Sequence, residues 1–287
     1  MIGKHQNLLS EINLRYANDN GIKLVRRISG GGTVYQDLHN LNFSFIHNFV
    51  NPDHVNVTRF TYPIFEALKF MGLNVEFSDR NDLLIESKKI SGNAMHIFRS
   101  RALSHGTLLF NTDLEHLSSA LQNNTKKYAD KSIKSIKSNV ANISNHLEKS
   151  ISINQFRDNL FQNVISRSIN PHIKPFDDQE ERNIDQISQE KFITWDWIYG
   201  YSPNYVFQNS FKISDVEVNI ELYVEKGIIK RVSMNINPKE NPFYYPTFDV
   251  LVNIKHDYKI IYELLEGKKI YNSMPNFNIS EFCYHLF

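Results

Sequence analysis

Two short segments of the chain combine residues that could bind an anion. The first, residues 26–37, places Gly30, Gly31 and Gly32 side by side after two arginines and a serine. Glycines cost about 0.5–1 kcal/mol each in backbone entropy relative to alanine, so they are expected where a turn needs positive φ or a ligand lies against bare backbone. For a glycine-rich loop alone, a tight turn is the simpler interpretation.

The second segment, residues 80–94, joins two lysines to a Ser-Gly pair, and the run 104–109 follows it. An ammonium is a compact point charge with three donors, so it can contact two oxygens at once. Lys88 and Lys89 are consecutive, and consecutive side chains of a strand point to opposite faces. Only one of them can therefore face a given site, and a lysine in such a pair is more commonly a solvated surface charge.

The elements around these segments favour an α+β fold. Residues 8–19 are predicted to form a helix, residues 22–28 a strand that runs into the glycines, residues 41–46 a strand and residues 57–71 a helix. Strands joined by glycine turns, with helices outside, indicate a layered α+β domain rather than repeated βαβ units. Further short strands are expected at 75–77, 83–86 and 108–110.

The second half of the chain follows a different pattern. Residues 153–168 are expected to form a closing helix, and residues 170–190, rich in Pro, Asp, Glu and Gln, a linker. A small meander then follows, with a terminal helix near 260–265. The strands of the meander are expected at 211–213, 216–224 and 228–236.

Composition narrows the classes of protein. The chain has 287 residues, 41% of them hydrophobic and 22% charged, which is typical of a globular protein. Its one cysteine, Cys283, excludes an internal disulfide framework and cysteine zinc spacings. A formal net charge of +1 gives no general attraction for nucleic acid. No apolar run near 18 residues and no secretory leader are evident, so we expect a cytoplasmic protein without a membrane partner.

Together the motifs resemble the lipoate-protein ligase family, whose pattern is Arg-Arg-x-Ser-Gly-Gly-Gly-x-Val-x-x-Asp, then Lys-x-Ser-Gly-x-Ala, then His-Gly-Thr-Leu-Leu. They occur here in the same order at 26–37, 89–94 and 105–109. The resemblance implies a biotin/lipoate ligase-like catalytic domain at 1–175, with a mixed sheet flanked by helices. It also implies a linker at 176–190 and a small α+β accessory domain at 191–287.

The resemblance further implies a two-step reaction with ATP, Mg²⁺ and lipoate. The lipoate carboxylate attacks the α-phosphate to give lipoyl-adenylate and pyrophosphate, and a carrier lysine then attacks the adenylate. Lys89 holds the position of the essential lysine, and Arg26 or Arg27 would bind phosphate. Asp82 is the candidate magnesium contact. The remaining binding residues implied are Ser29, Gly30, Gly31, Gly32, Asn40, Asn81, Asp82, Ser91, Gly92 and His105.

Several of these residues have structural interpretations as well. Asn40 could be the side chain of an Asx turn or a helix cap, and a lone histidine such as His105 is more often a structural hydrogen-bonding group. Residues 126–137 hold five lysines against one aspartate, a pattern usual for a solvated face. In the family such a segment is a loop that closes over the adenylate and could meet an acidic carrier domain.

The chain departs from the family pattern at three places. Relatives have a longer segment before the one that begins here at Met1, so the catalytic domain is expected to be N-terminally shortened. Gln36 and His39 replace a usual histidine and a usual glycine, which predicts a reshaped loop. His96 and Ser104 stand where relatives often have arginine and a first histidine. These differences affect nucleotide or partner contacts more than Lys89.

Three functions remain open from the sequence. The first is a lipoate-protein ligase whose acceptors are the E2 subunits of 2-oxoacid dehydrogenases or the glycine-cleavage H protein. The second is a lipoyltransferase that uses preformed lipoyl-AMP or a lipoylated carrier, and the third is a truncated binding protein without turnover. The sequence contains no phosphate-loop or kinase motif. It leaves open the carrier, the preference between lipoate and octanoate, and the oligomeric state.

Overall fold

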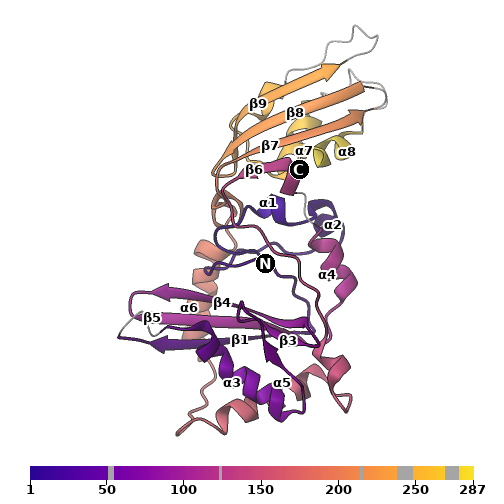
Figure 1. Ribbon diagram of the computed structural model, residues 1–287. Helices are drawn as coiled ribbons and strands as arrows, with labels where there is room; N and C mark the ends of the chain where they lie inside the picture. The colour runs from indigo at the N-terminus through magenta and orange to yellow at the C-terminus, as the bar shows by residue number, and fades with distance from the viewer. Residues whose placement is uncertain (51–54, 123–124, 214–215, 238–247, 269–277) are drawn as a thin grey trace.

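The computed structural model describes residues 1–50, 55–122, 125–213, 216–237, 248–268 and 278–287, in which the strands form two sheets (Figure 1). The first sheet has the order β1-β5-β4-β3-β2 and the second β6-β7-β8-β9, with antiparallel neighbours throughout. Helices cover both sheets, so the predicted α+β class is confirmed. The strands are β1 (Asn40–Asn48), β2 (Glu76–Phe77), β3 (Leu83–Ile85), β4 (Lys88–Phe98), β5 (Arg101–Leu109), β6 (Tyr128–Asp130), β7 (Tyr205–Ile213), β8 (Val216–Glu225) and β9 (Ile228–Asn237).

Helix α3 (Val57–Phe70) and helix α5 (Ile153–Ile165) pack on one face of the five-stranded sheet (Figure 1). In α3 the buried apolar side chains are Phe60, Ile64, Ala67 and Leu68, which share one helical face. Helices α7 (Tyr258–Gly267) and α8 (Ile279–Tyr284) cover the four-stranded sheet in the same way. Among the described residues, every helix is too short or too polar to traverse a bilayer.

The second core is built from distant parts of the chain. Apolar residues of the first 14 positions, among them Ile2, Leu8 and Leu14, pack in one cluster with β7, β8 and β9. Strand β6 pairs with β7 and so adds residues 128–130 to the same sheet. The division into 1–175, 176–190 and 191–287 stays a prediction, and residues from both sides of it share this core.

Two predictions near the N-terminus are wrong in part. The helix expected over 8–19 is broken into α1 (Leu8–Glu11) and α2 (Leu14–Asp19), because Ile12 is extended and the Asn13 side chain accepts a hydrogen bond from the Tyr16 amide. Residues 22–28 are not a strand of either sheet. Their pairing is a single parallel bridge between Arg26 and Ile2. The glycine segment therefore continues from a short N-terminal clasp, which consists of residues 2–6 paired with residues 25–29.

The segment expected to be an unstructured linker contains α6 (Asp178–Ile187) and a π-helical turn, η4 (Ser188–Phe192). Asp177 and Glu180 form a capping box that starts α6. The strand expected at 108–110 is the end of the longer β5. The other predicted elements are confirmed, namely the strands at 41–46, 75–77 and 83–86, the helices at 57–71 and 153–168, the meander and the helix near 260–265.

Candidate active site

A cavity of about 730 Å³ lies between the five-stranded sheet and the glycine segment. Its lining brings together two regions that are more than fifty residues apart in the sequence, the glycine motif and the lysine motif. The candidate residues on the lining are Arg26, Arg27, Gly31, Gly32, Asp82, Lys89, Gly92 and His105, and those outside it are Ser29, Gly30, Asn40, Asn81 and Ser91.

Three rows of residues from β1, β5 and β4 form the floor of the cavity. Side chains alternate along each strand, so positions two apart share a face. Ala102 and Ser104 of β5 are fully buried, whereas Leu103, His105 and Thr107 line the cavity. From the strand register the rows are Asn42, Thr107 and Gly92, then Ser44, His105 and Ala94, then Ile46, Leu103 and His96. In the third row only Leu103 is on the lining itself.

Lys89 lies at the first row and is fixed by its backbone. Its N–H donates to the carbonyl of Asn139, and its carbonyl accepts from the N–H of Ala141. The Nζ atom lies 2.9 Å from Oδ2 of Asp82, with the two side chains 27% and 19% exposed. The neighbouring Lys88 is exposed. Of the two lysines, Lys89 is therefore the one whose ammonium is held at the cavity.

Gly92 allows the Lys89 side chain to lie flat against β4. A Cβ at Gly92 would stand 3.2 Å from Cε and 3.4 Å from Nζ of Lys89. A side chain at Gly92 would therefore press on Cε of Lys89 and shift it by a few tenths of an ångström. The glycine of the Lys-x-Ser-Gly motif therefore leaves room for the Lys89 side chain.

Gly31 carries the conformational requirement of the glycine segment. Its φ is +90°, a value that L side chains rarely adopt, and an added Cβ would lie 3.0 Å from Nη2 of Arg27 and 4.0 Å from Cβ of Ala94. Gly30 differs, because a Cβ there would meet nothing within 4 Å. The backbone at Gly31 therefore lies over the second row of the floor. The backbone of Gly30, Gly31 and Gly32 forms the glycine roof of the cavity.

Arg27 shapes this roof. Its Nη2 donates to the carbonyls of Gly30 and Gly32, both at 2.7 Å, and its Nε donates to Ser29. Burial lowers the pKa of the guanidinium to about 10, so it remains charged at neutral pH. Its buried Nη1 has no hydrogen-bond partner within the part of the chain that the structure describes. Arg27 therefore keeps one donor for an anion in the cavity.

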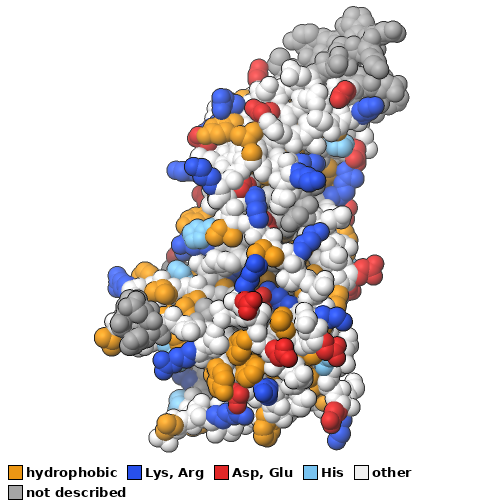
Figure 2. Space-filling model, viewed as in Figure 1, with side chains coloured by type: hydrophobic (Ala, Val, Ile, Leu, Met, Phe, Trp, Pro, Cys, Tyr) orange, Lys and Arg blue, Asp and Glu red, His pale blue; other side chains and the backbone are white. Residues whose placement is uncertain are grey.

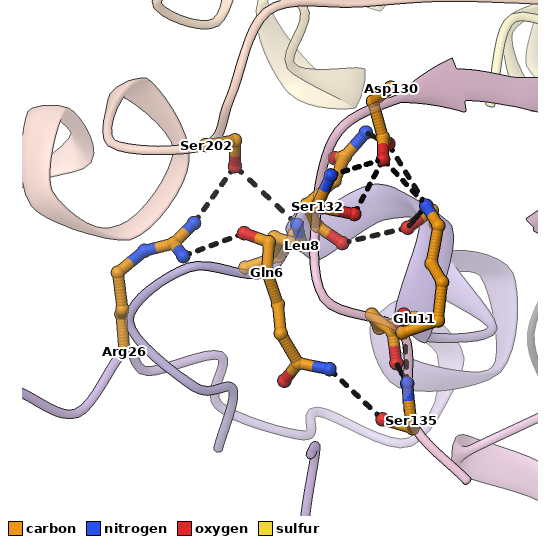
Figure 3. Close-up of polar contacts among 11 residues, drawn as sticks. Gln6, Leu8, Glu11, Arg26, Asp130, Ser132, Ser135 and Ser202 are labelled. Atoms are coloured by element: carbon orange, nitrogen blue, oxygen red, sulfur yellow. Dashed lines mark hydrogen bonds and ion pairs between the residues drawn. The ribbon is translucent and has the colours of Figure 1, made fainter. Parts of the chain in front are cut away.

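Arg26 has a different environment. Its guanidinium is 2% exposed and donates to the carbonyls of Trp197 and Ile198 and to Oγ of Ser202. Further hydrogen bonds reach the carbonyls of Gly3 and Lys4 in the N-terminal clasp. Figure 3 shows the bonds of Arg26 to the Gln6 carbonyl and to Ser202. All three nitrogens are used within the protein. This placement favours Arg27 over Arg26 as the anion-binding member of the pair.

Ser29 and His105 connect the roof to the floor. The Ser29 hydroxyl is 2.6 Å from Nε2 of His105, and Ser29 is 1% exposed. Burial, together with the nearby charge of Arg27, lowers the pKa of His105 below its usual range. The imidazole is therefore neutral at physiological pH and acts as a hydrogen-bonding support at the second row.

Three other candidates lie outside the cavity lining. The Asn40 side chain accepts a hydrogen bond from the Asp37 amide, as in an Asx turn. Asn81 has a φ of 62°, and its side-chain oxygen accepts a short hydrogen bond from the Thr58 hydroxyl. Ser91 is fully buried in β4. These environments support the structural interpretation of Asn40. Asn81, directly before Asp82, and Ser91, on the same strand as Lys89, have structural environments as well.

The lysine-rich segment 126–137 is held through Ser135 against Gln6 and Glu11 (Figure 3). The Ser135 hydroxyl oxygen accepts hydrogen bonds from the Gln6 side-chain amide at 3.0 Å and from the Thr33 backbone amide at 2.8 Å. Lys134 pairs with Asp130 at 2.8 Å. Burial acts to raise the pKa of Asp130, but hydrogen bonds from Lys134, Ser132 and Asn7 together lower it. These contacts hold the segment over Gly32.

The residues present fit a metal ion that arrives with its own phosphate ligands. Across the described ranges, no three His, Cys, Asp or Glu side chains are grouped to hold an ion. Asp82 is the single carboxylate on the described cavity lining, and Mg²⁺ is commonly held by one or two carboxylates plus substrate phosphates.

One wall of the cavity was not predicted from the sequence. Ser188, Phe192 and Ile193, from the turn after α6, contribute to the lining. The segment was interpreted as a linker because of its polar composition. The capping box at Asp177 and Glu180 is the signal that could have identified its helix.

Comparison with known families matches residues 1–165 to the Lipoyl protein ligase A/B catalytic domain. The chain is 35% identical to the lipoate-protein ligase LplJ of Bacillus subtilis, over 98% of this chain and 86% of that protein. It is 36% identical to lipoate-protein ligase 1 of Staphylococcus aureus, over 95% of this chain and 83% of that protein.

Solved structures give the same indication. A lipoate-protein ligase A bound with ATP is 28% identical with a TM-score of 0.56, covering 70% of this chain and 81% of that one. A lipoate protein ligase from T. acidophilum with bound lipoic acid, described as putative, is 28% identical with a TM-score of 0.55, over 69% and 80% of the two chains. A bi-partite ligase studied with its E2 lipoyl domain from Thermoplasma acidophilum is 28% identical, with a TM-score of 0.56 over 70% and 79%.

Proposed function

This chain belongs to the lipoyl protein ligase A/B family and is an ATP-dependent lipoate-protein ligase, and we propose that Lys89 carries its chemistry. ATP and lipoate are its small-molecule substrates. The observation that carries the proposal is the Lys89 ammonium, held at the cavity beside Asp82 and below the glycine roof. A fixed ammonium in a partly dry site stabilises negative charge that develops on oxygen.

In the proposed first step, a lipoate carboxylate oxygen attacks the α-phosphorus of ATP, and the bond to pyrophosphate breaks. Lys89 neutralises the carboxylate and the α-phosphate oxygens as they approach each other. Arg27 contributes its remaining donor from the roof. In the second step a carrier lysine amine attacks the acyl carbon and AMP leaves. The same ammonium then stabilises the charge on the departing phosphate.

We propose Asp82 as the contact for Mg²⁺. When bound with ATP, the ion would supply charge neutralisation at the phosphates. In the structure the Asp82 carboxylate forms an ion pair with the Lys89 ammonium, so a bound ion and Lys89 would share this carboxylate. Asn81 and Asn93 support the loop that carries Asp82, since the Asn93 side chain donates to the Asn81 carbonyl at 2.7 Å.

We propose that the acceptors are lipoyl domains of E2 subunits or the glycine-cleavage H protein, and that the reaction takes place in the cytoplasm. Figure 2 shows Lys and Arg side chains across the middle of the molecule, between the two sheets. The exposed Lys131 and Lys137 of the segment 126–137 lie next to the cavity lining. An acidic carrier would be steered toward such a surface.

The proposal is tested with an apo-lipoyl domain, an apo-H protein and an unrelated acidic protein as control. Each is incubated with the chain, lipoate, ATP and Mg²⁺, and lipoylation is measured as a mass increase. We expect modification of a single lysine on the carrier that requires ATP. Modification only from preformed lipoyl-AMP would instead support the transferase alternative, which the relatives with ligase names do not favour.

A further inference from the structure

The turn that follows α6 contributes to the cavity wall although it lies outside the glycine and lysine motifs. Ser188, Phe192 and Ile193 are on the lining, which also includes the charged side chains of Arg80, Asp82 and Lys89. We propose that the turn 188–193, and Ile193 in particular, forms the far wall of the acyl pocket and sets the length of acyl chain that the ligase accepts. This inference rests on the proposed function.

The direction of the acyl chain follows from the charges along the cavity. The carboxylate must meet the phosphate beside Lys89 at the first row, and the chain must then extend away from the phosphates. The second row contains Ala94, and the third row contains Leu103. The rows therefore gain apolar side chains from the first, which has none, to the third, which has Ile46 and Leu103 beside His96, as an acyl chain requires.

The turn shares the cavity lining with Leu103 of the third row. His96 belongs to this row, opposite Leu103. Burial lowers the pKa of His96, and the charges of Lys4 and Lys191 act in the same direction. Lys191 is part of η4, between Ser188 and Phe192. The side chains after α6 are thus placed where an acyl chain from Lys89 would end.

Arg26 and Trp197 hold this wall against the glycine roof. Arg26 donates to the carbonyls of Trp197 and Ile198, while the Trp197 indole N–H donates to the Arg26 carbonyl at 2.8 Å. Phe192 packs edge-on against Trp197, with ring centroids 5.9 Å apart. Arg27 follows Arg26 directly and Gly31 lies five residues after it, so the contacts of Arg26 connect the wall to the roof.

The dimensions agree with a measuring role. The first and third rows are four residues apart on β4, or about 13 Å at the usual rise of a strand. This is of the same order as the extended acyl chain of lipoate. Ile193 is 52% exposed, so its side chain can be changed in size with little loss of core packing. π-Helical turns such as η4 occur frequently at functional sites.

The test compares Ile193→Ala and Ile193→Trp with Ile187→Trp. Ile187 is a matched control, because it is 53% exposed at the end of α6, six residues before Ile193, but is absent from the cavity lining. The full chain and each variant are assayed for exchange of labelled pyrophosphate into ATP with hexanoate, octanoate, decanoate and lipoate. Thermal melting of each variant shows that it is folded.

We expect Ile193→Trp to lower kcat/KM for octanoate relative to hexanoate by at least about tenfold, since one methylene in an apolar pocket changes selectivity by that order. Ile193→Ala should raise the ratio of decanoate to octanoate in a similar way, and Ile187→Trp should change neither ratio. An unchanged chain-length profile in both Ile193 variants would overturn the inference alone. Absence of exchange with every acid in the unmodified chain would instead contradict the proposed function.

Discussion

The Nζ atom of Lys89 lies 2.9 Å from Oδ2 of Asp82 at the rim of the cavity. Lys89 is on β4 and Asp82 directly precedes β3, and these two strands are neighbours in the sheet. In the absence of substrates the carboxylate thus neutralises the ammonium and holds it at the cavity. Phosphate oxygens and a metal ion would compete for the two partners of this pair.

Asp82→Asn should weaken the dependence on Mg²⁺ because it removes the proposed carboxylate ligand. We expect the Mg²⁺ concentration at half-maximal pyrophosphate exchange to rise at least tenfold, or about 1.4 kcal/mol. Asp79→Asn is the matched control, since Asp79 is exposed and outside the cavity lining. Identical Mg²⁺ titrations for Asp82→Asn and the unmodified chain would exclude Asp82 as the contact.

Gly31→Ala should weaken lipoate binding, because Gly31 has a φ of +90° and a Cβ there would press on Arg27. We expect at least about a tenfold loss of affinity by calorimetry, which corresponds to about 1.4 kcal/mol. Gly30→Ala is the control, since its Cβ would meet nothing within 4 Å. Equal affinities for the two variants would show that the segment serves only as a turn.

Arg26→Met should destabilise the fold. The change leaves the buried carbonyls of Trp197, Ile198 and Gln6 without their donor. Each unsatisfied buried group is costly, so we expect a loss of at least about 3 kcal/mol in the free energy of unfolding, measured by urea denaturation. Arg15→Met removes a half-exposed pair with Glu281 and a cation–π contact with Tyr284, and should cost at most about 1–2 kcal/mol. Similar losses for both variants would argue against a structural role for Arg26.

His256 predicts how stability changes with pH. Its Nε2 donates to the Leu286 carbonyl and its Nδ1 accepts from the Tyr205 hydroxyl, so the ring is neutral. Burial lowers its pKa from 6.5 to about 4, although the bond to Leu286 acts in the opposite direction. Because the folded pKa lies below the unfolded one, this stability is present above pH 6.5 and is lost as the pH falls toward 4.

The expected loss from His256 is about 3 kcal/mol across that window. His256→Gln should be less stable at pH 7 but should depend less on pH between 7 and 4, as measured by urea unfolding at each pH. His172→Gln changes an exposed histidine and should keep the slope of the unmodified chain. A slope for His256→Gln equal to that of the unmodified chain would refute this origin of the acid sensitivity.

The sequence predicts the elements whose apolar residues keep one regular period. In α3 the buried positions recur with helical spacing, and in β8 Val218, Ile220 and Leu222 alternate with exposed residues. Strands β4 and β5 do not show a regular apolar period. Their cavity face includes Gly92, and their opposite face buries Ser104, so the hydrophobic alternation is hidden.

The candidate site was predictable where one motif fixes both sequence and backbone, as at Gly31 and Lys89. It was not predictable for Arg26, because two adjacent arginines have the same chemistry. What separates them is the carbonyl of Trp197, 171 residues away, which accepts from Arg26 and not from Arg27. The turn 188–193, which precedes Trp197, lies at the cavity through contacts between distant parts of the chain. Local sequence patterns do not predict such contacts.

The most direct test of the central claim is lipoate-dependent exchange of labelled pyrophosphate into ATP, with Mg²⁺, for the unmodified chain, Lys89→Ala and Lys88→Ala. Removal of a preorganised charge at the reacting oxygens should lower the exchange rate by at least about a hundredfold in Lys89→Ala. Lys88→Ala, which changes an exposed neighbour, should keep the unmodified rate. Exchange by a folded Lys89→Ala protein at the unmodified rate would contradict the assignment of Lys89.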